Sequence, residues 1–192
     1  EENLKAIDLL GQALDCAPDY VPAMAYKAWC HAHQCCYLWT KDGAADRAMA
    51  VELAARATPL ASDDAAALVA LSAVAGLAQN DFVQAKMLAE RALALDANNA
   101  WGWLRMGWTS IYLAEFDKGF EAFDRYDQLS PLDPFHFNGL FGRAAGLRAM
   151  KRYDESIALT ERGLREGTGV TWAYRMLFGT QLLAGNTDKA AE

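Results

Sequence analysis

Residues 100–133, AWGWLRMGWTSIYLAEFDKGFEAFDRYDQLSPLD, decide the fold. Two short amphipathic helices joined by a turn at Glu115–Asp117 fit this stretch, because apolar and small residues recur at helical spacing on both sides of the turn. The pattern is marked at offsets of 0, 3, 4, 16, 20, 23 and 28 by Trp103, Met106, Gly107, Gly119, Phe123, Tyr126 and Pro131. The stretch therefore predicts a pair of packed antiparallel helices.

The second half of this pattern recurs through the chain. A small residue begins each second helix, and the residues four and seven positions later complete the motif. The copies, at intervals of 44, 35, 34, 37 and 34 residues, are Ala6/Leu10/Ala13, Ala50/Ala54/Ala57, Ala85/Ala89/Ala92, Gly119/Phe123/Tyr126, Ser156/Thr160/Gly163 and the start of a sixth at Ala190. A period of this length indicates stacked helix pairs that bury their apolar faces only against neighbouring pairs.

The repeat and its flanking turns predict the helices and no strand. The expected helices are Asn3–Asp15, Tyr20–Cys36, Asp42–Thr58, Asp64–Ala78, one opened by Asn80 and Asp81 and ending near Leu95, Trp101–Leu113, Phe116–Leu129, Phe135–Met150, Tyr153–Arg165, Val170–Leu183 and one from Thr187 onward. Ser62 and Asp63 are expected to cap the fourth helix, and Asn98 or Asn99 the sixth. We expect a single segment, residues 1–192, of five to six repeats that is truncated at both ends of a larger protein.

Composition supports an all-α fold. The chain is 53% hydrophobic with Ala as the dominant apolar residue, and Ala is the strongest helix former. The net charge of −7 provides no basic footprint for nucleic acid. The chain has neither a signal peptide nor a long uncharged apolar run, so no membrane association is expected. Four cysteines in a chain of 192 residues are typical of reduced thiols, which predicts a cytoplasmic protein.

These residues and their period resemble the tetratricopeptide repeat family over essentially the whole chain. The resemblance implies a right-handed α-solenoid in which first helices line a concave groove and second helices lie outside. The run Leu129–Phe135, and the helix pair with a long loop after His33, resemble repeat regions of bacterial signalling proteins such as class III adenylate cyclases and winged-helix regulators. That resemblance implies a regulatory or oligomerisation region of a larger signalling protein. Self-association is a separate hypothesis, because the exposed truncated ends of the array could stack on copies of themselves.

The groove is the main candidate site. In the repeat register, the groove-facing or groove-edge residues of the first helices are Trp29, His33, Trp101, Arg105, Trp108, Tyr112, Phe135, Asn138, Trp172 and Arg175. Large aromatic residues occupy five inward-groove positions, namely Trp29, Trp101, Trp108, Phe135 and Trp172. Aromatic and Arg side chains are common anchors for a peptide or a partner helix. The same aromatic stripe could instead be packing, so both interpretations stay open at this stage.

The alternative is a metal-binding or redox module formed by the cluster Cys30–Cys36, which contains His31, His33 and Cys35. Zinc needs about four ligands in a tetrahedral arrangement, and no single helix face presents four of these residues. We therefore expect no metal and no cofactor here.

An enzyme segment is the remaining alternative. Ser130, Asp133 and His136 are the candidates for nucleophilic catalysis, but they cross a Pro-rich turn without an oxyanion loop. We expect no catalytic site in this segment, although a larger protein could carry one elsewhere.

Overall fold

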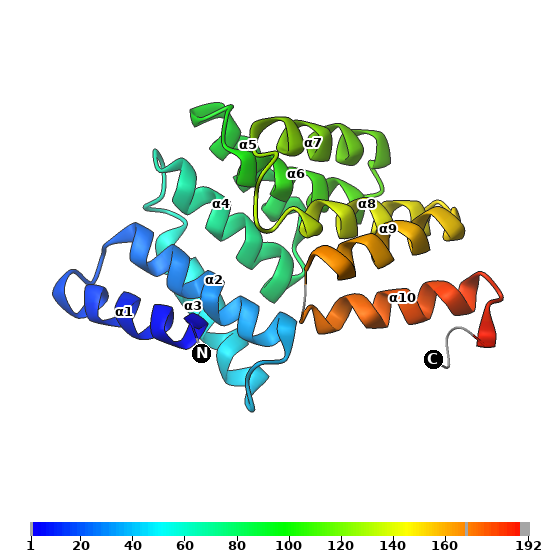
Figure 1. Ribbon diagram of the computed structural model, residues 1–192. Helices are drawn as coiled ribbons and strands as arrows, with labels where there is room; N and C mark the ends of the chain where they lie inside the picture. The colour runs from blue at the N-terminus through cyan, green and yellow to red at the C-terminus, as the bar shows by residue number, and fades with distance from the viewer. Residues whose placement is uncertain (1, 168, 189–192) are drawn as a thin grey trace. The chain divides into compact units, whose positions relative to one another are not determined.

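The computed structural model describes residues 2–167 and 169–188, and every regular element within them is helical (Figure 1). The elements are α1 (Glu2–Cys16), α2 (Val21–Tyr37), α3 (Gly43–Ala57), α4 (Ala65–Val74), the π-helix η1 (Ala75–Gln79), α5 (Phe82–Leu95), α6 (Ala100–Tyr112), α7 (Phe116–Leu129), α8 (Phe137–Ala149), α9 (Tyr153–Glu166) and α10 (Thr171–Leu183). No helix among these residues is both long and apolar enough to cross a membrane. The all-helical prediction is confirmed.

Local hydrogen bonds explain where the helices begin. Asn99 caps α6 by accepting a hydrogen bond from the Gly102 amide, one of the two caps expected for this helix. The expected cap of α4 is wrong: Asp64, rather than Ser62 or Asp63, accepts the hydrogen bond from the Ala67 amide. Asp64 has extended backbone geometry, which is the usual conformation of an N-cap residue.

The start of α8 also differs from the expectation of a helix from Phe135. The helix begins at Phe137, because residues 134–136 form a turn in which the Asp133 carboxylate accepts a hydrogen bond from the Phe135 amide. Asp and Asn side chains stabilise turns of this kind in competition with helix geometry. Phe135 therefore lies in a turn and not on a first helix.

The chain divides into two compact units, residues 1–105 and 106–192, and the boundary falls within α6. In the first unit the chain folds back on itself, so that α2 packs against α1, α3 and α4, and α4 packs against α5 (Figure 1). The core of this unit is dominated by Ala side chains, with Met24, Leu68, Leu71 and Val74 completely or almost completely buried. Alanine-rich faces allow the helices to approach closely.

In the second unit α8 packs against α7 and α9, and α10 packs against α9. Phe123, Tyr126 and Phe141 are completely buried here. Glycines make room for these rings: a Cβ added to Gly107 would lie 2.5 Å from the Phe123 ring, and one added to Gly163 would lie 2.5 Å from the Phe141 ring. Small residues at these positions thus leave space for aromatic rings from neighbouring helices.

The repeat motif coincides with the core. Its three positions are buried in α3, α5, α7 and α9, and the corresponding residues of α1 (Ala6, Leu10 and Ala13) are partly buried. The sixth copy, at Ala190, lies outside the described residues. The side chain of Tyr174 on α10 is exposed, as are those of Phe178 and Leu182 on the same helix.

Candidate functional site

The first unit gathers three of the predicted groove residues around one tryptophan. Trp29 on α2 lies 5.2 Å from His33, one turn later, and 5.3 Å from Trp101 on α6, measured between ring centroids. The two indoles meet edge to face, the favourable arrangement for aromatic pairs. The Arg105 guanidinium lies 6.0 Å from the Trp101 ring centroid, within range of a cation–π contact. We call Trp29, His33, Trp101 and Arg105 the first aromatic cluster.

His33 is the most strongly perturbed titratable group in this cluster. Burial, together with a smaller effect of the nearby positive charge of Arg105, lowers its pKa from 6.5 to about 4. The imidazole is therefore neutral at neutral pH and can act as an aromatic surface with one donor and one acceptor nitrogen. The indole Nε1 of Trp29 is buried and has no hydrogen-bond acceptor among the described residues.

The second unit contains another set of the predicted residues. Trp108 on α6 stacks on Tyr112, with centroids 5.9 Å apart, and meets the edge of Trp172 on α10 at 6.1 Å. Trp172 also contacts Phe141 at 5.1 Å. Tyr112 is 57% exposed, so this set extends from the packed interior to the solvent. We call Trp108, Tyr112 and Trp172 the second aromatic cluster.

The other predicted groove residues lie apart from these contacts. Phe135 is 48% exposed and contacts Phe137 from the turn before α8, so its expected place on a groove-facing helix position is wrong. Asn138 is partly buried near the start of α8. Arg175 is exposed on α10. Of these three residues, Arg175 is the one that presents an exposed charge.

The cysteine cluster makes structural contacts. His31 Nδ1 bonds to the Asp46 carboxylate and ties α2 to α3, while the Cys35 thiol donates to the Gly43 carbonyl. Burial raises the pKa of the Cys30 thiol, and burial together with Asp46 raises that of Cys35. Thiols with raised pKa values are poor nucleophiles and poor metal ligands at neutral pH. The four cysteines are not joined by disulfides among the described residues, and this part of the chain contains no group of three or more metal-ligating side chains.

His136, one of the three residues considered for nucleophilic catalysis, is placed between two carboxylates. His136 Nδ1 lies 2.8 Å from Glu166 Oε2, and its Nε2 lies 3.5 Å from Asp127 Oδ1. Burial raises the pKa of Glu166, but hydrogen bonds from His136 and Arg162 outweigh that effect and lower it overall. Both ring nitrogens of His136 thus face carboxylates from α7 and α9, as expected of a link between helices.

The arrangement of helices places the chain in the all-helical class, with a repeat fold of the tetratricopeptide type. Among solved structures, a crystal structure of MamA, a helical repeat protein, is similar over 83% of this chain and 85% of that chain, with a TM-score of 0.54 and 17% identity. A second MamA crystal structure matches 86% of this chain and 82% of that chain, with a TM-score of 0.54 and 18% identity. No family model matches the sequence, and no curated protein does. At this level of identity the similarity shows the fold alone.

Proposed function

We propose that this protein is a non-catalytic interaction scaffold that binds a peptide or a partner helix along its first helices. A repeat fold of the MamA type supports a role in protein interaction. Repeat proteins of this architecture present extended surfaces, built from one helix of each pair, to their partners. The proposed contact residues are the two aromatic clusters together with Asn138 and Arg175.

The observation that carries the proposal is that the aromatic clusters are only partly covered. Trp29, Trp101, Trp108 and Trp172 are all partly exposed, and Tyr112 is 57% exposed. Partly exposed aromatic side chains next to Arg groups are the usual composition of binding hot spots. A purely structural stripe would be expected to bury these rings as completely as Phe123 and Phe141 are buried.

A selection experiment tests this proposal. A displayed library of random peptides is selected on the immobilised protein, and enriched peptides are measured by calorimetry. Tyr112→Ala and Arg175→Ala are expected to weaken binding about tenfold, as typical hot-spot truncations do, without lowering the melting temperature. Leu132→Ala, at a side chain that is 93% exposed in a turn, is the matched control and should change neither quantity. Failure to enrich any peptide, or enriched peptides that bind both variants normally, would contradict the proposal.

The wider setting is also a proposal. The resemblance of the Leu129–Phe135 run to signalling proteins supports a regulatory or oligomerisation region in a cytoplasmic bacterial signalling protein. The net charge of −7 argues against nucleic acid as the partner. The coding sequence upstream of Glu1 tests the setting, because a regulatory region should be joined to a catalytic or DNA-binding domain.

A further inference from the structure

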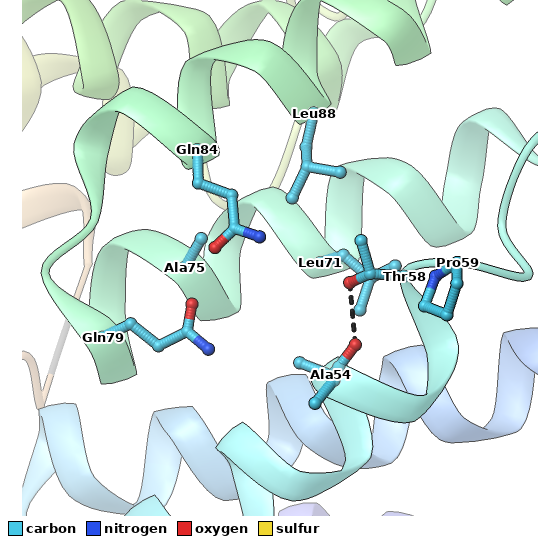
Figure 2. A pocket seen from close by; sticks show the side chains of 9 residues that line it. Ala54, Thr58, Pro59, Leu71, Ala75, Gln79, Gln84 and Leu88 are labelled. Carbon is cyan, nitrogen blue, oxygen red and sulfur yellow. Dashed lines mark hydrogen bonds between the residues drawn. The ribbon is translucent and has the colours of Figure 1, made fainter.

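A pocket in the first unit lies between the end of α3, the continuous helix α4–η1 and α5 (Figure 2). Its volume is about 320 Å³, at the small end of ligand-binding pockets, which span roughly 300–1,000 Å³. The lining residues are Ala54, Ala55, Thr58, Pro59, Leu71, Ala75, Gln79, Gln84 and Leu88. None of the proposed groove residues is among them, so we treat the pocket as a separate site.

Helical spacing determines what faces the pocket. Leu71, Ala75 and Gln79 are four residues apart along α4–η1 and share one face, and Gln84 and Leu88 share a face of α5 in the same way. The π-helix ends at Gln79 and is followed by Asn80, which has positive φ; the Asp81 amide donates a hydrogen bond to the Ala75 carbonyl. Single-turn π-helices are frequent at functional sites.

Two side-chain amides project into this pocket. Figure 2 shows Gln79 and Gln84 extending from η1 and α5 into the space beside Ala75. Among the described residues, neither amide group has a hydrogen-bond partner within the chain. The Thr58 hydroxyl is already committed, because it donates to the Ala54 carbonyl at 2.7 Å. Each Gln amide therefore offers a carbonyl acceptor and two N–H donors to an occupant.

The remaining walls are apolar and uncharged. Ala54, Leu71, Ala75 and Leu88 are at most 5% exposed and form the floor. No lining residue carries a formal charge, so nothing offsets the cost of removing water from an ionised ligand. The occupant that matches this lining is neutral, aliphatic on one side and able both to donate and to accept hydrogen bonds on the other.

We propose that this pocket binds one aliphatic residue of a partner peptide, with its side chain against Leu71 and Leu88. The Gln79 and Gln84 amides bond to the neighbouring backbone peptide groups, each of which contains one N–H donor and one carbonyl acceptor. The mouth carries Ala55 and Pro59, which are exposed and short, so a passing backbone can approach it closely. The site recognises a neutral aliphatic segment through its main chain and is independent of the aromatic clusters.

The experiment titrates N-acetyl-L-leucine methylamide, a single residue flanked by two peptide groups, into the isotope-labelled protein. Saturable NMR shifts of the Gln79 and Gln84 side-chain amides are expected, with a dissociation constant in the millimolar range for so small a ligand. Gln84→Met keeps the side-chain length and should weaken binding about 2- to 10-fold, the effect of one neutral hydrogen bond. Ala55→Phe should fill the mouth and abolish binding without changing the melting temperature, because Ala55 is exposed.

Matched probes and a control variant make the test decisive. Gln128→Met, on the exposed surface of α7, should bind the probe like the unmodified protein. N-acetyl-L-alanine methylamide should bind more weakly, because it buries less apolar surface. The proposal is overturned if the Gln79 and Gln84 amides do not shift, if Gln84→Met binds normally, or if anionic N-acetyl-L-leucine binds more tightly than the neutral probe. These results do not depend on Tyr112 or Arg175, so they distinguish failure of this site from failure of the proposed groove.

Discussion

His33 shows how burial changes the chemistry of one side chain. The ring lies between Trp29 and Tyr37, with centroid separations of 5.2 and 5.5 Å, and its pKa falls from 6.5 to about 4. In the unfolded chain the same imidazole returns to its ordinary pKa and binds a proton more readily. Protonation therefore favours the unfolded state once the pH drops below 6.5.

The first prediction concerns this pH dependence. The contribution of His33 to stability is fully present above pH 6.5 and is lost as the pH falls towards 4, by up to about 3 kcal/mol for a shift of this size. His33→Gln, which cannot be protonated, should remove that part of the dependence. Urea unfolding across this pH range measures it. Parallel curves for the two proteins would show that His33 is protonated equally easily in the folded state.

Gly142 supports a second prediction at the scale of single residues. A Cβ added at Gly142 would clash with the Phe123 ring, which is completely buried. Gly142→Ala should destabilise the protein by about 1–3 kcal/mol, the usual cost of overpacking a core, even though Ala is the better helix former. Gly179→Ala is the control: its new Cβ would meet only the end of Arg148 at 3.8 Å, and the change should stabilise α10 by about 0.5–1 kcal/mol.

Thermal and urea unfolding of both glycine variants measure these effects. A Gly142→Ala protein as stable as the original would show that Phe123 can move aside and that the crossing is loosely packed.

At the residue scale, the sequence predicts which residues occupy the small positions of the repeat, but not which distant side chains contact one another. The small positions Gly107 and Gly119 could be predicted from the repeat, because their spacing is local. The contact of Trp29 with Trp101 joins helices 72 positions apart in the chain and has no local signature. Gln79 and Gln84 carry no sequence signal, because isolated polar residues are common on amphipathic helices and only the fold brings their amides into one pocket.

At the scale of elements, buried hydroxyl groups link the two helices of a pair by hydrogen bonds. Ser72 on α4 donates to the Ala85 carbonyl on α5 at 2.7 Å, and Ser156 on α9 donates to the Ala144 carbonyl on α8 at 2.7 Å. Ser72 and Ser156 are at most 1% exposed. Ala85 and Ser156 occupy the same repeat position. In one helix pair this position accepts the hydrogen bond through its carbonyl, and in the other it donates the bond through its hydroxyl.

The third prediction follows from these crossings. Ser72→Ala should lower the free energy of unfolding by about 0.5–1.5 kcal/mol, the net value of one buried hydrogen bond. Ser62→Ala, in the exposed turn before α4, should leave it unchanged. Urea titrations of the two variants at the same pH make the comparison. Equal stability of both variants would mean that the Ala85 carbonyl is satisfied by its own helix alone.

Helix boundaries could be predicted where the repeat motif marks both ends of the helix. Phe116–Leu129 is found as expected, since the motif sets both of its ends. The π-helix was not foreseen, because Leu71, Ala75 and Gln79 follow ordinary α-helical spacing. The wider turn appears only in the backbone hydrogen bonds to the Ala75 carbonyl. The late start of α8 depends on a turn at Asp133, which competes with the favourable placement of Pro134 in a first helical turn.

At the scale of the whole molecule, α10 presents an apolar stripe to solvent. Tyr174, Phe178 and Leu182 are four residues apart and 57%, 51% and 45% exposed, so they lie along one helix face. Contiguous exposed apolar surface of this kind usually marks an interaction site. A second copy of the chain is the occupant that the predicted self-association would place there.

The fourth prediction tests this self-association. The average mass measured by light scattering should rise with protein concentration, and Phe178→Glu should hold the protein at the mass of one chain. Leu132→Glu adds the same charge at an isolated exposed apolar residue and should not alter the rise. A constant single-chain mass for the unmodified protein would exclude the stripe as a self-contact.

The architecture could be inferred from sequence because the spacing of the motif residues is visible along the chain. This spacing does not identify what the repeats bind, since the motif residues are buried in the core. The single segment of five to six repeats remains a prediction, while the structure resolves two compact units that meet within α6. The groove residues likewise remain proposals, because surface chemistry depends on which side chains are left uncovered after folding.

The packing around Phe123 has an evolutionary consequence. Its ring occupies space that a Cβ at Gly107 or at Gly142 would need, although these glycines belong to different repeats. Each glycine is therefore coupled to Phe123: an alanine at either position is accommodated without loss of stability only after the ring has been replaced by a smaller side chain. Natural variants of this chain should show that covariation. The pairing of Phe123→Leu with Gly142→Ala should recover stability that Gly142→Ala alone loses.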